Sequence, residues 1–259
     1  MNSRPGILHP ARLLPAALLL LAAGIAFGLA TVVIPTRGPM RWDEANHALK
    51  ALLMAHDLGR GDWLSFAFNS YRQVLYPPLH SWLLGTVYLA VGPSIAAVAG
   101  TSLVLYLLTA WLIYLAGRPL SHGRANLVGA VAALLWLTSP PLLDYAVQGM
   151  LEVPGLVGVV LTLLVALKLS ADDRSEQGMV TAPRPRQWTW LGLALALAFF
   201  TRVPFGIVLG MAVAAMLLVR ARLRPRTLWR PEIGWFLLPL LILFGVWFAY
   251  PAKIPATVQ

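Results

Sequence analysis

Apolar runs close to 20 residues long recur along the chain, and they constrain the fold more than any other feature. A helix needs about 20 apolar residues to cross the roughly 30 Å hydrocarbon core of a bilayer, and the first run, Leu13–Ile34, already reaches that length. Of the 259 residues, 59% are hydrophobic and 12% are charged, whereas a soluble domain has about 25% charged residues. We therefore predict an all-α, polytopic membrane protein.

Eight apolar segments are candidates for membrane helices. One of them, Leu79–Gly92, is short and lies between Pro77-Pro78 and Gly92-Pro93, so we expect it to be re-entrant or interfacial. The other seven are predicted to span the membrane: Leu13–Ile34, Ser94–Gly117, Ala125–Leu143, Val153–Leu169, Trp188–Phe200, Phe205–Val219 and Trp235–Tyr250. The whole chain, residues 1–259, is expected to form one transmembrane module.

The positions of the basic residues favour seven spans. Lys and Arg in short loops tend to remain on the cytoplasmic side, and seven spans leave thirteen of the 20 inside, whereas eight would leave only four there. This topology predicts a cell membrane protein with a cytoplasmic N-terminus and an extracytoplasmic C-terminus. The two segments around Pro204 could also form one kinked helix, but that would bury Arg202, so a hairpin is preferred.

Composition and motifs exclude several functional classes. The net charge of +10 comes from residues in loops between apolar runs, where they orient helices, so no nucleic-acid partner is expected. The absence of cysteine excludes disulfides, thiolate nucleophiles and cysteine-ligated metals. The five histidines show no spacing typical of a zinc site.

The first outside loop, residues 35–78, is predicted to contain an amphipathic helix at the membrane surface. It opens with Trp42-Asp43-Glu44 and continues with two stripes, Ala45, Ala48, Leu49 and Leu52 on one and Asn46, Lys50 and Asp57 on the other. The two acidic residues have a purely structural interpretation, in which Asp43 is the helix N-cap and Glu44 complements the helix dipole.

Two more outside loops bring ionisable residues to the same face. The turn after the third span carries Asp144, Gln148 and Glu152, and the next outside turn carries Arg202. Their convergence with Asp43 and Glu44 favours a functional site, although such groups also pair at span ends for structural reasons. Because hard cations prefer carboxylate oxygens, Asp43 and Glu152 are also candidate ligands for a divalent metal ion, the one cofactor considered.

Five motifs occur in order along the chain: Trp42-Asp43-Glu44, Gly61-Asp62-Trp63-Leu64, Tyr76-Pro77-Pro78-Leu79, Glu152-Val153-Pro154 and Thr201-Arg202-Val203-Pro204. With this order and common sidedness, the chain resembles the GT-C superfamily of membrane glycosyltransferases, particularly bacterial aminoarabinose transferases and protein O-mannosyltransferases. The resemblance covers about Arg12 to Val219, and seven spans match the helical module of that superfamily.

The resemblance implies sugar transfer from a polyprenyl-phosphate donor to a lipid, glycan or protein acceptor at the extracytoplasmic face, with inversion at the anomeric carbon. In that family the first-loop acidic motif, here Asp43 with Glu44, acts as general base or metal ligand, and Glu152 supports it. Arg202, where the family usually has lysine, would bind the donor phosphate. The remaining cleft or substrate residues would be Asn46, His47, Tyr76, Pro77, Pro78, His80, Asp144 and Gln148.

Such enzymes usually continue through further helices, and the C-terminal part of that architecture is absent from this sequence. Two alternatives to a transferase therefore stay open. The chain could be a non-catalytic or truncated subunit whose partner chain supplies the missing helices. A transporter is the other alternative, but its ionisable residues would lie near the middle of broken helices, and here they gather at helix ends.

Overall fold

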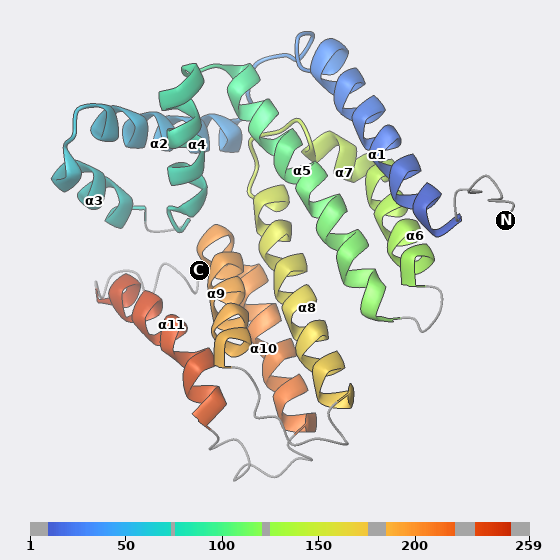
Figure 1. Ribbon diagram of the computed structural model, residues 1–259. Coiled ribbons are helices and arrows are strands. Elements are labelled where there is room, and N and C mark those ends of the chain that lie inside the picture. The colour runs from blue at the N-terminus through green and yellow to red at the C-terminus, as the bar shows by residue number, and fades with distance from the viewer. Residues whose placement is uncertain (1–9, 74–75, 121–124, 176–184, 221–230, 250–259) are drawn as a thin grey trace, which may run out of the picture.

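The computed structural model describes residues 10–73, 76–120, 125–175, 185–220 and 231–249, and every regular element in these ranges is a helix. The prediction of an all-α fold is therefore confirmed for this part of the chain. The α-helices (Figure 1) are α1 (Pro10–Gly28), α2 (Trp42–Gly59), α3 (Trp63–Tyr71), α4 (Leu79–Val91), α5 (Ile95–Gly117), α6 (Ala125–Thr138), α7 (Pro140–Tyr145), α8 (Glu152–Ser175), α9 (Pro185–Thr201), α10 (Val203–Arg220) and α11 (Pro231–Phe248).

Three described stretches are long and apolar enough to cross a bilayer: Leu13–Val33, Ile95–Gly117 and Glu152–Ser170. The first joins α1 to a π-helical turn at Leu29–Val33. Four shorter apolar stretches lie in α4, α6, α10 and α11. The count of seven spans stays a prediction, and Tyr250, the end of the last predicted span, lies outside the described residues.

Helices α5, α8 and α9 form the centre of the bundle. Helix α8 packs between α5 and α9, α6 packs on α5, and α11 packs on α9. Helices α2, α3 and α4 lie at one end of this bundle (Figure 1), where α2 packs against α4. The starts of α5 and α8 face this same end, and the Ser102 hydroxyl in α5 donates to the carbonyl of Gln148 just before α8.

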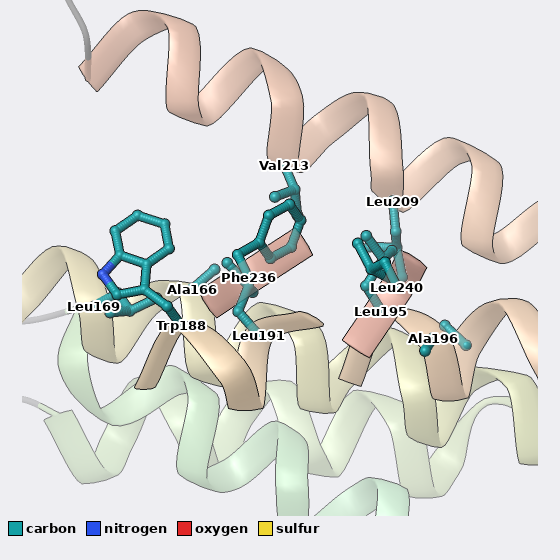
Figure 2. Close-up of a cluster of buried hydrophobic side chains, with 11 residues drawn as sticks. Ala166, Leu169, Trp188, Leu191, Leu195, Ala196, Leu209, Val213, Phe236 and Leu240 are labelled. Carbon is teal, nitrogen blue, oxygen red and sulfur yellow. The ribbon is translucent and has the colours of Figure 1, made fainter. Parts of the chain in front are cut away.

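The largest buried cluster holds α8, α9, α10 and α11 together (Figure 2). Leu209 and Val213 of α10 point toward the side chains of α9 and α11, including Leu191 and Phe236. The chain reverses in a close turn at Arg202. The two sides of this turn touch, since a Cβ on Gly206 would lie 2.4 Å from Cβ of Phe199. One helix kinked through Pro204 would hold these two residues about two turns apart, so α9 and α10 form a hairpin.

One of the predicted spans is wrong. The segment Ala125–Leu143 is not one helix, because Pro140 and Pro141 lack the N–H groups that would continue α6, and the short α7 begins there. On α2, Leu49 and Leu52 are exposed, whereas Ala48, Ala51 and Ala55 are buried with Leu84 of α4. Small side chains let the two helices approach closely. The placement of the leucine stripe at a membrane surface stays a prediction. Asp57, expected on the polar stripe, is buried and accepts a hydrogen bond from Asn69 at 2.7 Å.

Candidate active site

The side chain of Glu44 is enclosed by the protein and makes polar contacts with three segments of the chain. Its side chain is fully buried, pairs with the Arg37 guanidinium, and accepts hydrogen bonds from the N–H groups of Arg41 (3.0 Å) and Gly149 (2.6 Å). Burial raises the pKa of Glu44, but these three donors lower it more, so that the net pKa lies below its usual value of 4.5. Glu44 is therefore ionised, and its hydrogen bonds connect the start of α2 to the turn before α8.

Asp43, the neighbour of Glu44, is exposed. The interpretation of Asp43 as the N-cap is wrong, because α2 begins at Trp42 and its N-cap residue is Arg41. Asp43 lies in the first helical turn, where the positive end of the helix favours its carboxylate. It is also close enough to Lys50 to oppose the drop in the pKa of that lysine, which burial causes. Asp43 is thus an exposed carboxylate at the start of α2.

Glu152 and Arg202 form an ion pair across two helix ends. Glu152 is the first residue of α8, and Arg202 lies at the turn between α9 and α10. The pair reaches solvent, since the side chains of Glu152 and Arg202 are 20% and 32% exposed. The guanidinium carbon also lies 5.1 Å from the ring centre of Phe205, a distance typical of a cation–π contact. The structure therefore joins the second and third predicted outside loops through opposite charges.

A cluster of rings lies where α2 meets the start of α4. The His47 ring is 4.9 Å from the Tyr76 ring and 5.7 Å from the His80 ring, both in edge-to-face orientation. The Lys50 ammonium lies 5.1 Å from the centre of the Tyr76 ring. Both histidines are buried, at 3% and 2% exposure. The backbone of Gly149 lies beside His80 without a well-formed hydrogen bond to either ring nitrogen.

The two imidazoles are neutral at physiological pH. Burial lowers the pKa of His47 to about 4, and the positive charges of Lys50 and Arg202 add to the effect. Burial likewise lowers the pKa of His80 to about 3, helped by His47 and partly opposed by the backbone of Gly149. The influence of Arg202 on His47 shows that the guanidinium is within electrostatic reach of α2. All three predicted outside loops therefore meet at one end of the bundle.

The other predicted site residues surround this region to different degrees. The Gln148 amide donates to Asp144 at 2.7 Å, and Gln148 is buried whereas Asp144 is exposed. Pro77 and Pro78 are buried at the entry to α4, while Asn46 and Tyr76 are partly exposed. The assignment of these residues to a substrate cleft stays a prediction.

An apolar groove of about 710 Å³ lies beside the polar residues, between α3, α4, α9 and α11. Its lining includes Trp82, Trp190 and Trp247. Pro78 and Leu79 also line it and directly precede His80, and Phe200 lines it two residues before Arg202. One part of the groove therefore adjoins the charged region.

Sequence reasoning missed Arg37, Lys50 and Gly149 as members of the site. Arg37 offered one signal, since a basic residue shortly before an acidic helix start can pair with it. Gly149 offered none, because it contributes only a backbone N–H and lies 105 residues from Glu44. Such a contact depends on the packing of α5 and α8.

No group of three or more His, Asp or Glu side chains that could hold a metal ion occurs among the described residues. Of the two predicted ligands, Glu152 already pairs with Arg202, so a cation would have to compete with the guanidinium. A divalent ion held by Asp43 and Glu152 therefore stays a prediction.

Comparison with protein families gives one finding. The family model of dolichyl-phosphate-mannose-protein mannosyltransferases matches residues 76–250 of this chain. The match begins at Tyr76 and includes Glu152 and Arg202, whereas Asp43 and Glu44 precede it. It confirms the resemblance to GT-C glycosyltransferases. Comparison with curated proteins and with solved structures gives no match.

Proposed function

Because the chain belongs to the dolichyl-phosphate-mannose-protein mannosyltransferase family, a family of GT-C membrane glycosyltransferases, we propose that it transfers a sugar from a polyprenyl-phosphate donor. The acceptor is a lipid, glycan or protein hydroxyl at the extracytoplasmic membrane face, and the anomeric carbon is inverted. The observation that carries this proposal is the position of Arg202, which is partly exposed and follows two residues after Phe200, a residue that lines the apolar groove.

Arg202 binds the donor phosphate in this proposal. A guanidinium offers two parallel N–H donors to phosphate oxygens, and charge accumulates on the phosphate as its bond to the sugar breaks. Phe205 and Glu152 hold the arginine in place before the donor arrives. A donor group that is already positioned stabilises the developing charge without reorganisation.

Asp43 is the general base. It is exposed in the first turn of α2, whereas Glu44 is enclosed by Arg37 and two backbone N–H groups. Of these two neighbouring carboxylates, Asp43 is therefore the one that can accept a proton from an incoming hydroxyl. Glu44 is assigned a positioning role, since it ties the start of α2 to Gly149 and so sets where Asp43 lies relative to α8.

The apolar groove receives the polyprenyl chain. Aromatic and aliphatic side chains line it, and it adjoins the charged region through Phe200 and Pro78. A lipid-linked donor combines a long hydrocarbon chain with a phosphate, which is the combination that this groove and Arg202 complement. The volume is also within the usual range for ligand pockets.

Sugar transfer in proteoliposomes tests the proposal. Wild-type protein is supplied with polyprenyl-phosphate-linked sugars and membrane acceptors, and Asp43→Asn is compared with Asp62→Asn. We expect Asp43→Asn to slow transfer by about 10²- to 10⁴-fold, the usual contribution of a general base. Asp62 caps α3 and is not one of the proposed site residues, and asparagine also caps helices well, so Asp62→Asn controls for loss of one negative charge. Equal rates for the two variants would refute the assignment of Asp43.

The alternative of a non-catalytic or truncated subunit predicts a different experimental result. If the chain is a non-catalytic or truncated subunit, the wild-type protein alone transfers no sugar, and a partner chain with further membrane helices co-purifies with it. Addition of that partner would then restore transfer. The family assignment favours either of these over a transporter.

A further inference from the structure

The ion pair of Glu152 and Arg202 has an unused acceptor. One carboxylate oxygen of Glu152 contacts the guanidinium, while the other is buried and has no hydrogen-bond partner in the described part of the chain. Arg202 is the more exposed member of the pair. A ligand that approaches from solvent therefore meets a guanidinium that already has a carboxylate beside it.

The turn that carries Arg202 is held in place by its own backbone. The Arg202 N–H donates to the Ala198 carbonyl at 2.9 Å, and the Arg202 carbonyl accepts from Phe205 at 3.1 Å. On the facing helix, a Cβ on Gly155 would lie 2.7 Å from the Phe205 ring and 3.4 Å from Cβ of Arg202. Because α8 packs this closely against the turn, the backbone of Arg202 is held near Glu152. A phosphate that binds the guanidinium in this arrangement lies near the carboxylate.

We propose that Glu152 sets the product affinity of the site, weakening the binding of a phosphate monoester on Arg202 more than the binding of a phosphate diester. This inference rests on the proposed function and specifies the part of it that concerns the donor phosphate.

The chemistry of transfer gives the reason. The acceptor oxygen forms a bond to the anomeric carbon, its proton passes to Asp43, and the bond between that carbon and the phosphate oxygen breaks with its electron pair left on the phosphate. The donor is a diester with one negative charge, whereas the product is a monoester with about −1.5 to −2 charges at pH 7. A carboxylate next to the guanidinium repels the second charge, so the lipid phosphate leaves more readily.

The test is a binding measurement on the full chain in detergent at pH 8. The probes are farnesyl phosphate and its methyl diester, which share one hydrocarbon chain and differ in charge. For Glu152→Gln we expect the ratio of monoester to diester affinity to rise by roughly tenfold relative to wild type, a change of about 1.4 kcal/mol. Glu152→Asp keeps the charge and should keep a ratio close to that of wild type. Asp62→Asn, which removes a charge outside the Glu152–Arg202 pair, should leave the ratio unchanged.

An affinity ratio for Glu152→Gln equal to that of wild type would overturn the inference, provided that both proteins bind the probes. Failure of the proposed function gives a different result, because neither probe would then bind wild type and Arg202→Gln would change nothing. If Glu152→Gln does not fold, the comparison of Glu152→Asp with wild type decides, since a ratio shifted by tenfold there contradicts a charge effect.

Discussion

Two glutamates at the same end of the bundle have opposite surroundings. Glu44 is fully buried and pairs with Arg37 and two backbone N–H groups, whereas Glu152 is one-fifth exposed and pairs with a guanidinium that also reaches solvent. A buried charge with several donors fixes structure, and a partly exposed pair remains available to a ligand. The enclosed region, defined by Glu44, His47 and His80, thus supports the open region, defined by Asp43, Glu152 and Arg202.

Glu44→Ala tests the enclosed region and has the largest expected effect. It leaves the mostly buried Arg37 guanidinium without its carboxylate and the Gly149 N–H without an acceptor, so we expect a loss of about 3 to 5 kcal/mol in the free energy of unfolding. Thermal unfolding in detergent measures it, with Asp62→Asn as the control. A melting temperature equal to that of the control would show that Glu44 does not stabilise the fold.

Acid pH should destabilise the enclosed region. The unfolded chain protonates both histidines below about pH 6.5, whereas the folded protein keeps them neutral because the pKa values of His47 and His80 are about 4 and about 3. The unfolded state then binds more protons, so stability falls as the pH drops from 6.5 toward 4, by about 1.4 kcal/mol per pH unit for each ring. The melting temperature of the double variant His47→Asn/His80→Asn should depend less on pH across this range than that of wild type. A wild-type curve that is already flat contradicts the burial of neutral imidazoles.

Arg202→Gln tests the open region through activity. Loss of the cation that faces the donor phosphate should slow sugar transfer by roughly 10²-fold, while Arg202→Lys should keep part of the rate, since lysine also binds phosphate. Both rates are measured in proteoliposomes with a polyprenyl-phosphate donor. Transfer by Arg202→Gln at the wild-type rate would exclude Arg202 from phosphate binding.

Glu152→Ala has the smallest expected effect on stability. The ion pair is partly exposed, and such pairs contribute at most about 1 kcal/mol. Its melting temperature should therefore stay close to that of wild type, in contrast to Glu44→Ala. A loss as large as that of Glu44→Ala would remove the distinction between the two regions.

Most of the long helices and the meeting of Glu152 with Arg202 followed from the sequence, because apolar run length, proline position and loop charge are local signals. They placed α5 nearly to the residue and brought Glu152 and Arg202 to one face. The roles within the acidic pair did not follow, since the burial of Glu44 depends on Arg37 and on a backbone N–H of Gly149. The buried stripe of α2 was also missed, because alanines become a packing surface only against α4.

Labelling of introduced cysteines tests the central claim most directly, since the native chain contains none. Asp43→Cys, Asp144→Cys and Pro204→Cys place one thiol at an exposed position in each of the three loops, and Arg118→Cys places one at the other end of α5. In right-side-out vesicles, a membrane-impermeant maleimide should label the first three and not the fourth. Labelling of any of the three only from the opposite side would contradict a shared active site.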